Sequence, residues 1–334
     1  MFIYLMKQIE VYTRSEDLPK LLPSGILHSV EMFKVLIRRS KTKPHLFVCR
    51  EGDDIIAHLL VVEQREFRLM PPGVYTWYSI YGEGVYKEEY KKEKENIFAL
   101  FIDKLLKLFR FKHSFIEIRN IAESSFAYKV LSDRDFFPRK CIRIYNSLHS
   151  KTPQERLARA YKAHIKNAEK RGVICEQATC IEDIKFGIEL LYKYYISKIK
   201  QHLPQKEILK ELLIGEDGTL SQQFRMFIVR YRDKIIGCSI CFYENDRAYL
   251  AYSCGLRKSH PLLYPGIMAI WVAITDAYKQ GYSHFEFCET NLFSRKSSGY
   301  INLVLNFGGK QVSTLRWYHF KWNRINKILR AIYV

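Results

Sequence analysis

An internal repeat limits the folds that this chain can form. Segments starting at His45 and Arg225 both read as a strand, a tight polar turn and a second strand. Their identical positions share one offset of 180 residues: Phe47 with Phe227, Arg50 with Arg230, Asp53 with Asp233, and Ile56 with Ile236. A constant offset indicates a duplicated structural unit.

The elements that follow also repeat in order, as strand, helix, strand, helix and strand. We expect them near residues 75–85, 88–109, 114–118, from 124 and 139–145, and again near 248–254, 266–280, 284–288, from 297 and 312–320. The predicted class is α/β (α+β): two tandem units, each with a mixed, mostly antiparallel sheet flanked by helices. The predicted domains are residues 1–145 and 146–334.

Charge points to an anionic partner. A chain of 334 residues is too long for one hydrophobic core, and it carries a net charge of +19. Residues 1–145 contribute +6 and residues 146–334 contribute +13. The second half is therefore expected to hold a phosphate-bearing cofactor, RNA or an anionic membrane surface. A merely solvated basic surface is the alternative.

The location is predicted as cytoplasmic, with peripheral contact with an anionic membrane left open. The longest apolar run, residues 267–275, is too short for a membrane span, and the N-terminus resembles a first strand.

The eight cysteines read as buried free thiols. Cys238 and Cys241 form a CxxC on a strand, where they face opposite sides, so no metal site is expected. The oligomeric state stays open.

A helix with strong end signals is expected over residues 152–172. Thr152 and Glu155 form a capping box with a proline between them, and Gly172 ends the helix. One face carries a basic stripe that is a candidate anion-binding surface: Arg159, Lys162, Lys166 and Lys170. The alternative is a solvated helix face.

Two short motifs carry a family resemblance. AHIKNAEKRGV at residues 163–173 and the Phe-Gly-Gly at residues 307–309 resemble FemABX-type acyltransferases, in which two GNAT-like (Gcn5-related N-acetyltransferase) folds are joined. The resemblance implies an enzyme, an N-acyl or aminoacyl transferase. It would use acyl-CoA or aminoacyl-tRNA as a co-substrate, with no tightly bound cofactor. The acceptor would be an amine of a cell-envelope precursor, lipid or sugar.

Two departures from this family keep a second function open. Peptidoglycan-bridge members resemble F-K-x-x-F-G before the last strand, and this chain has Val304 where they have the lysine. Residues 181–214 also leave room for only two ordinary helices, not a long helical arm. The alternative is a non-catalytic descendant that binds RNA or an anionic lipid.

The resemblance implies a donor site in the second half. GNAT-like units hold pantetheine between splayed strands and the pyrophosphate at the following helix N-terminus, where free N–H groups favour anions. No acidic residue lies between Asp246 and Asp276, whereas Glu88 and Glu89 open the first-half helix. The expected cofactor-binding residues are Tyr252, Ser253, Arg257, Lys258, Ser259, His260 and Gly266. A basic surface loop that binds no phosphate is the alternative.

Acyl transfer to an amine needs a base and a leaving-group acid. Glu289, at the C-terminal end of its strand, and Tyr300, on the next helix, are the catalytic candidates. A surface carboxylate and a packing tyrosine are the alternatives. The first half would contribute an acceptor pocket, where a cluster of aromatic residues could stack on a glycan or peptide: Trp77, Tyr78, Tyr81 and Tyr86. Ordinary core and rim packing of these residues is the alternative, and the one we favour.

Overall fold

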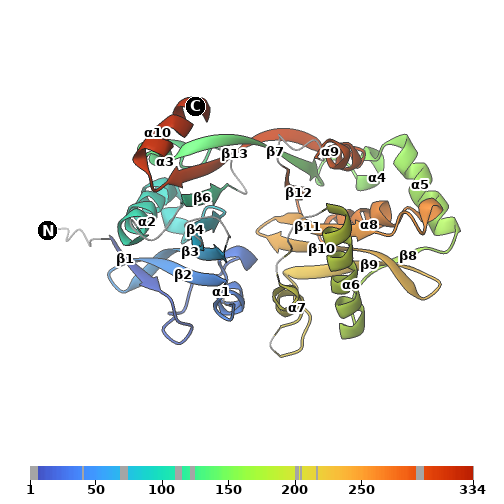
Figure 1. Cartoon of the computed structure of the whole chain (residues 1–334). Helices are drawn as coiled ribbons and strands as arrows, with labels where there is room; N and C mark the ends of the chain where they lie inside the picture. Colours follow the sequence, from blue (N-terminus) through green and yellow to red (C-terminus); the bar gives the residue numbers. More distant parts are fainter. Residues whose placement is uncertain are drawn as a thin grey trace. The chain divides into compact units, whose positions relative to one another are not determined.

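The computed structural model divides the chain into two compact units (Figure 1). It describes residues 7–39, 41–67, 74–109, 115–120, 125–199, 203, 205–215, 217–290 and 297–333. Unit 1 comprises Met1–Cys141 and Ser313–Val334, and unit 2 comprises Ile142–Val312. The expected boundary after residue 145 lies close to the first division point. The expectation of two continuous domains did not include the return of the C-terminal segment to unit 1.

Unit 1 is a mostly antiparallel sheet with the strand order β1-β2-β3-β4-β6-β13, in which only β4 and β6 run parallel. Its strands are β1 (Lys7–Tyr12), β2 (Thr42–Glu51), β3 (Asp54–Phe67), β4 (Val74–Tyr81), β5 (Val85–Tyr86), β6 (Phe115–Arg119) and the end of β13 (Lys310–Phe320). Its helices are η1 (Ile26–His28), α1 (Val30–Ile37), η2 (Glu88–Glu93), α2 (Lys94–Phe109), α3 (Tyr128–Ser132) and α10 (Asn323–Tyr333).

Helices cover both faces of the unit 1 sheet because side chains alternate along its strands. On β2, Phe47 packs with Phe101 of α2 in one core. The next residue, Val48, packs with Phe33 of α1 in a second core on the other face. A two-residue hydrophobic alternation within an almost continuous apolar run thus produces a three-layer unit.

Unit 2 repeats this arrangement with the strand order β7-β12-β11-β10-β9-β8, in which only β11 and β12 run parallel. Its strands are the end of β7 (Phe137–Ser147), β8 (Ile174–Gln177), β9 (Phe224–Tyr231), β10 (Lys234–Glu244), β11 (Arg247–Gly255) and β12 (His284–Thr290). Its helices are α4 (Pro153–Arg156), α5 (Arg159–Lys170), α6 (Ile181–Tyr194), η3 (Tyr195–Ile199), α7 (Lys206–Leu213), η4 (Pro261–Leu263), α8 (Pro265–Lys279) and α9 (Ser297–Leu305).

Neighbouring residues of β10 show that α6 and α8 lie on opposite faces of the unit 2 sheet. The Cys238 thiol donates to the backbone oxygen of Gly187 in α6, at 3.4 Å. The Ser239 hydroxyl donates to the backbone oxygen of Ala269 in α8, at 2.7 Å. Because successive side chains point to opposite faces, the two helices enclose the sheet.

The predicted repeat and fold class are confirmed. The element order β2-β3-β4-α2-β6-α3-β7 recurs as β9-β10-β11-α8-β12-α9-β13. The matched arginines even make matched ion pairs with the preceding strand: Arg50 Nε lies 2.8 Å from Glu10, and Arg230 Nε lies 3.2 Å from Glu176. The final strands are exchanged, however. β6 of unit 1 pairs with β13, and β12 of unit 2 pairs with β7.

The predicted single helix over residues 152–172 is wrong in one respect, because it is broken into α4 and α5. The capping box of Thr152 and Glu155 is present, and Gly172 ends α5 with a φ of +83°. Between the two helices, Leu157 is extended and buried. The amide of Ala158 donates instead to the Asn306 oxygen at 2.9 Å, so a tertiary hydrogen bond and apolar burial outweigh helix continuity.

Candidate functional site

The two parallel strands of unit 2 separate part-way along their length. Pairing of β11 with β12 ends where Leu250 lies opposite Phe287. β11 then continues to Gly255, and no strand in the described part of the chain pairs with this stretch on the β12 side. A sheet edge of this kind presents backbone N–H and C=O groups that can bind an extended molecule.

A bulge marks the point of separation. Tyr252 pairs with Ile240 of β10, and Leu250 pairs with the next residue of β10, so Ala251 is an extra residue. Bulges re-aim side chains and end pairing, and they are frequent beside functional sites. The candidates Tyr252 and Ser253 follow this bulge within the unpaired stretch, and both are partly exposed.

The equivalent strands of unit 1 do not separate. Pairing of β4 with β6 continues to the last residue of each strand, where Tyr81 lies opposite Arg119. The amide of Gly82 then donates to the Arg119 oxygen at 2.9 Å. Only the unit 2 copy of the repeat therefore opens between its parallel strands.

Glycines bring the N-terminus of α8 directly onto the end of β11. A Cβ atom on Gly255 would lie 2.2 Å from the amide nitrogen of Gly266. A Cβ atom on Gly237 of β10 would lie 2.9 Å from the Pro265 oxygen. No side chain fits at either position, so the first turn of α8 packs against the backbone where β11 diverges.

This helix end is suited to an anion. The first turn of α8 has no acidic residue, and no side chain caps it, because the N-cap Tyr264 is left-handed with a φ of +48°. The loop before it carries the exposed candidates Arg257, Lys258 and Ser259. Uncapped N–H groups, the helix dipole and two cations favour negative charge here.

His260, the remaining loop candidate, is partly buried, and its ring lies 6.4 Å from that of Tyr231. Its buried Nδ1 atom has no hydrogen-bond partner among the residues that the structure describes.

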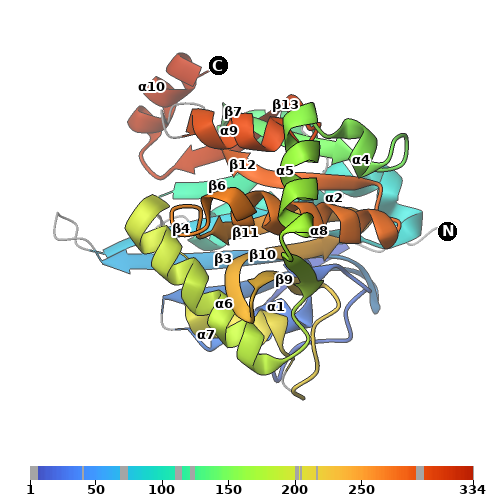
Figure 2. The ribbon, with the colours of Figure 1, turned by 90° about the vertical axis from the view of Figure 1, so that its right-hand side faces the viewer.

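Helix α5 lies beside this loop (Figure 2). The His164 ring of α5 stacks on the Tyr264 ring with centroids 4.0 Å apart, and Arg171 donates to the Leu262 oxygen at 3.2 Å. All four residues of the predicted basic stripe are exposed, and none takes part in an ion pair within the described ranges: Arg159, Lys162, Lys166 and Lys170. The stripe therefore adds unpaired positive charge to the helix that borders the loop.

The catalytic candidates stay untested by the geometry. Glu289 belongs to β12 and Tyr300 to α9, but the side chains of both lie outside the part that the structure describes. Val304, at the position of the family lysine, is fully buried in the unit 2 core. In this chain that position serves packing.

The Phe-Gly-Gly motif has a structural role that the sequence did not reveal. Gly308 has a φ of +85°, and a Cβ atom there would lie 2.5 Å from the Cβ of Arg156. The side-chain amide of Asn146 donates to the Phe307 oxygen at 2.8 Å. The motif thus joins the end of α9 to α4 and β7 by close backbone packing.

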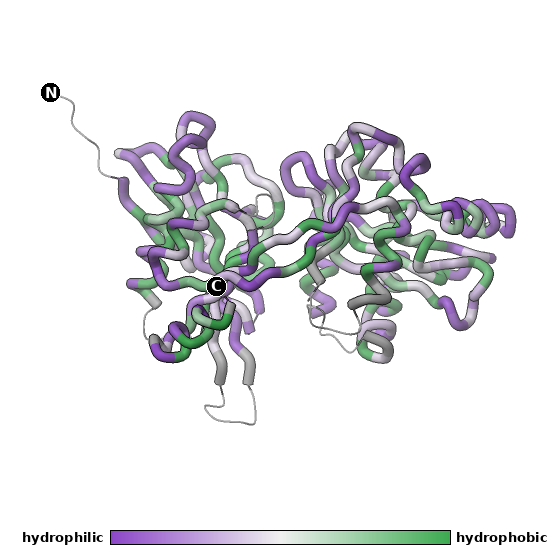
Figure 3. Tube along the Cα trace, turned by 90° about the horizontal axis from the view of Figure 1, so that it is seen from above, coloured by the Kyte–Doolittle hydropathy of each residue, from purple (hydrophilic) through white to green (hydrophobic). Residues whose placement is uncertain are grey.

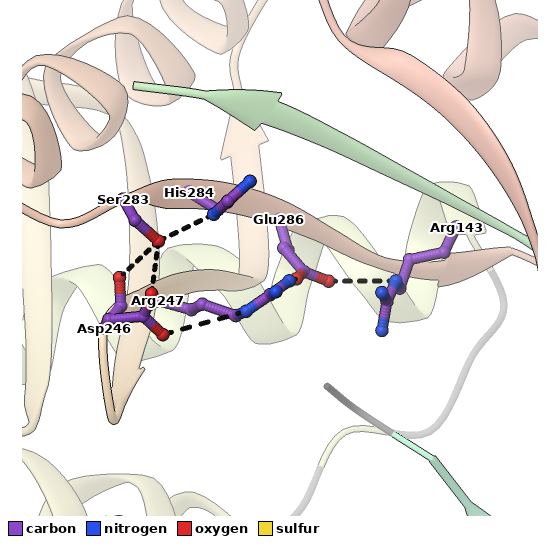
Figure 4. A network of polar contacts seen from close by, with 6 residues as sticks. All are labelled: Arg143, Asp246, Arg247, Ser283, His284 and Glu286. Atoms are coloured by element: carbon purple, nitrogen blue, oxygen red, sulfur yellow. Dashed lines mark hydrogen bonds and ion pairs between the residues drawn. The ribbon is translucent and has the colours of Figure 1, made fainter. Parts of the chain in front are cut away.

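A buried charge cluster on β12 also escaped the sequence reasoning (Figure 4). Glu286, only 1% exposed, pairs with Arg143 of β7, whose Nε atom lies 3.1 Å away, and with Arg247 of β11. Burial raises the pKa of Glu286, and the positive charge of Arg143 opposes this rise. Where β11 and β12 begin, the Ser283 hydroxyl lies within hydrogen-bond distance of both the Asp246 carboxylate and the His284 ring. No local pattern could reveal this cluster, because its members come from three strands.

The aromatic residues of the expected acceptor pocket do not form one surface. Tyr78 is buried in the unit 1 core, with its hydroxyl 3.3 Å from Glu63. Trp77 and Tyr81 point to the other face of β4, where Tyr81 lies under the Arg119 guanidinium. Tyr86 donates its hydroxyl to the Glu83 oxygen. The proposed acceptor role of these residues gains no support.

Two features are absent from the part of the chain that the structure describes. Among the described residues, no three His, Cys, Asp or Glu side chains come together as metal ligands. None of the helices in the described ranges combines the length and apolar character of a membrane span.

Comparison with known proteins agrees with the fold described above. Residues 197–293 match the model of the acetyltransferase (GNAT) domain family. The structure of FemX is similar over 93% of this chain and 95% of its own, with a TM-score of 0.64 and 12% identity. No curated protein sequence matches the chain.

Two other solved structures are similar. The C-terminal domain of a protein assigned as a lysylphosphatidylglycerol synthetase from Agrobacterium fabrum covers 81% of this chain and 84% of its own, with a TM-score of 0.56 and 11% identity. A tandem GNAT protein from the clavulanic acid biosynthesis pathway covers 94% and 99%, with a TM-score of 0.51 and 10% identity. The resemblance predicted from the sequence is confirmed for the fold: the chain is similar in fold to FemX and to a tandem GNAT protein, and the acetyltransferase (GNAT) domain family matches it at residues 197–293.

Proposed function

We propose that this chain is an acyltransferase that moves an acyl or aminoacyl group from an anionic carrier, acyl-CoA or aminoacyl-tRNA, to an amine. The single observation that carries the proposal is the separation of β11 from β12 beyond Leu250, directly beside the uncapped N-terminus of α8. This arrangement suits an extended donor arm along the strand edge that no described strand covers on the β12 side, with the donor's phosphates at the neighbouring helix end.

Electrostatics support unit 2 as the donor side. The α8 end and the Arg257–Lys258 loop present positive charge, whereas α2 of unit 1 follows Glu88 and Glu89 and has Glu95 in its first turn. Carboxylates at a helix N-terminus occupy the place that a phosphate would take and repel it. The repeated fold thus carries one site suited to a phosphate-bearing donor.

Within this site, we propose separate roles for backbone and side chains. Backbone N–H groups of β11 beyond Leu250, near Tyr252 and Ser253, would polarise the donor carbonyl. Arg257, Lys258 and the α8 N-terminus would hold the carrier's phosphates. A base and an acid, for which Glu289 and Tyr300 remain our candidates, would take the proton of the ammonium and protonate the leaving group. The acceptor would be an amine of a cell-envelope precursor, lipid or sugar.

The α5 stripe offers a way to separate the two carriers. A CoA molecule has few phosphates, and these would meet the α8 end alone. A tRNA backbone would extend along Arg159, Lys162, Lys166 and Lys170, and every phosphate contact steepens the salt dependence of binding.

Binding measurements with acyl-CoA and with aminoacyl-tRNA, followed by transfer assays with radiolabelled donors, test the proposal. Arg257→Glu with Lys258→Glu should weaken binding of the true donor and lower its salt slope by roughly 2. Lys166→Glu with Lys170→Glu should do the same for tRNA only. The control, Lys129→Glu with Lys140→Glu, changes two exposed lysines of unit 1 and should leave donor binding and its salt slope unchanged.

The outcomes separate the two functions. Donor binding followed by acyl transfer supports the proposal. Binding of tRNA or anionic lipid without transfer to any amine would favour the non-catalytic alternative. Unchanged donor affinity and salt slope in Arg257→Glu with Lys258→Glu would show that these two residues do not bind the donor's phosphates.

A further inference from the structure

Helix α10 of unit 1 is attached to the protein through its polar side. Asn326 is 4% exposed, donates to the Asp135 backbone oxygen at 2.5 Å and accepts from the Phe320 amide at 3.1 Å. Arg330 pairs with the Asp135 carboxylate at 3.0 Å. These contacts define the face of α10 that points inward.

Three isoleucines of α10 point outward instead, whereas Leu329 is partly buried. Ile325 is 42% exposed, Ile328 59% and Ile332 66%, and Trp322 just before the helix is 49% exposed. At about 100° per residue, the three isoleucines fall within about 60° of one another, and Asn326 lies about 100° or more away from each. A helix on a globular protein normally buries its apolar stripe, so this orientation is the reverse of the usual one.

The charge around this apolar face has one sign. Residues 290–334 contain no acidic residue and eight basic ones. Arg324 and Lys327 are exposed, and neither takes part in an ion pair within the described part of the chain. At about 100° per residue, Arg324 lies about 40° from Ile328, whereas Lys327 lies about 100° or more from each isoleucine. Hydrophilic and hydrophobic positions alternate along this last helix, close to the marked C-terminus (Figure 3).

We propose that α10 docks unit 1 onto an anionic lipid bilayer, lying in the plane of the membrane surface. Exposed isoleucines would enter the acyl boundary, Trp322 would sit at the headgroup level, and Arg324 and Lys327 would meet lipid phosphates. The helix of 11 residues is about 16 Å long and far too short to cross a bilayer. Charge complementarity selects an anionic bilayer over an apolar protein surface, because a buried protein interface is depleted in lysine. The inference does not depend on the proposed transferase activity.

Vesicle flotation of the full chain tests the proposal. The protein should bind vesicles of equal parts phosphatidylcholine and phosphatidylglycerol, and bind pure phosphatidylcholine vesicles much more weakly. Ile328→Ser with Ile332→Ser should lower binding by about 10-fold or more, since each buried isoleucine contributes strongly. Arg324→Gln with Lys327→Gln should lower binding by about 10-fold, and only to the anionic vesicles.

A matched control uses two exposed isoleucines of unit 2, Ile174 and Ile196, which are 57% and 69% exposed. Ile174→Ser with Ile196→Ser should leave vesicle binding unchanged. A second readout is the blue shift of tryptophan fluorescence on adding anionic vesicles. This shift should fall sharply in Trp322→Phe, because Trp271 and Trp317 are already buried and the partly exposed Trp77 stacks on Phe115.

Three results would overturn the proposal. The first is absence of binding to anionic vesicles by the folded wild-type chain. The second is binding that survives both α10 variants but is lost in Lys166→Gln with Lys170→Gln, which would assign the membrane contact to α5. The third is a wild-type dimer that Ile328→Ser with Ile332→Ser converts to a monomer, which would identify a second copy of the chain as the occupant.

Discussion

Gly255 at the end of β11 and Gly266 in the first turn of α8 approach so closely that a Cβ atom on Gly255 would lie 2.2 Å from the Gly266 amide nitrogen. Real Cβ contacts do not occur at this distance. The reverse does not hold, because a Cβ atom on Gly266 would meet nothing within 4 Å. The two glycines therefore serve different purposes: Gly255 permits the strand and helix to touch, and Gly266 leaves open space at the helix end.

The first prediction uses this asymmetry. Gly255→Ala must displace the α8 backbone, so we expect its free energy of unfolding to fall by about 1–3 kcal/mol or more. Gly266→Ala fits without overlap and gains helix propensity, so its stability should be unchanged or higher by up to about 1 kcal/mol. Urea denaturation of both variants and the wild type gives the comparison.

The same pair also reports on the anion site. If a phosphate approaches the α8 end, the added methyl of Gly266→Ala should weaken donor binding while the protein stays fully folded. Equal stability of Gly255→Ala and wild type would contradict the close packing of the two elements. Unchanged donor affinity in Gly266→Ala would place the phosphate elsewhere.

Much of this architecture could be predicted because its signals are local. The turn at Arg232–Asp233 has positive φ at both residues, and the capping box at Thr152 needs only residues three apart. Strand and helix periodicity then placed most repeated elements within a few residues of their observed bounds. The repeat strengthened each local prediction, because the same pattern of strands and helices occurs in both halves of the chain.

The remaining features depend on contacts between distant residues. Exchange of β7 and β13 between the units leaves each strand's own hydrophobic pattern unchanged, so no pattern could reveal it. The end of pairing at Leu250 coincides with a bulge at Ala251 of β11, which only the register with β10 reveals. The break at Leu157 results from a hydrogen bond between Ala158 and Asn306. Such long-range interactions override local helix and strand preference.

The second prediction concerns the catalytic candidates. Tyr300→Phe removes only a hydroxyl, and a leaving-group acid at this position predicts a fall in kcat of roughly 10²–10⁴-fold with KM little changed. Glu289→Gln removes only the ability to accept a proton, so a general base there predicts a fall of similar size. Steady-state kinetics with the donor identified by binding measures both effects.

Thermal unfolding must accompany these assays, because a loss of fold would imitate a loss of chemistry. Val304→Ile is a matched control, since Val304 lies in the unit 2 core near the same helix and has no proton to transfer. Full activity in both Tyr300→Phe and Glu289→Gln would end their catalytic assignment and leave positioning of the two substrates as the source of rate enhancement.

The third prediction concerns the buried Glu286. Glu286→Ala leaves Arg143 and Arg247 facing each other without the carboxylate between them, and we expect the free energy of unfolding to fall by roughly 3–5 kcal/mol. A matched exposed pair provides the control: Glu189→Ala removes the partner of Lys206 and should cost no more than about 1 kcal/mol. Equal losses in the two variants would show that burial adds nothing to the Glu286 cluster.

The fourth prediction concerns two buried histidines of unit 1, His28 and His58. Burial, assisted by the neighbouring His58 charge, lowers the pKa of His28 to about 3, and burial lowers the pKa of His58 to about 4. Both lie below the ordinary histidine pKa of 6.5. Between pH 6.5 and these lowered pKa values, the two histidines are protonated in the unfolded chain but neutral in the folded chain. The free energy of unfolding therefore falls as the pH drops below about 6.5.

Each histidine should contribute a slope of up to roughly 1.4 kcal/mol per pH unit, or about 2 kcal/mol between pH 7 and pH 5. His58→Leu keeps a similar volume and removes one titrating group, so its loss of stability over that interval should be smaller than the wild-type loss by about 2 kcal/mol. Urea denaturation at pH 7 and pH 5 measures the difference. His149→Gln alters an exposed histidine and should keep the wild-type slope. A slope in His58→Leu as steep as that of the wild type would show that His58 takes up its proton in the folded chain as readily as in the unfolded one.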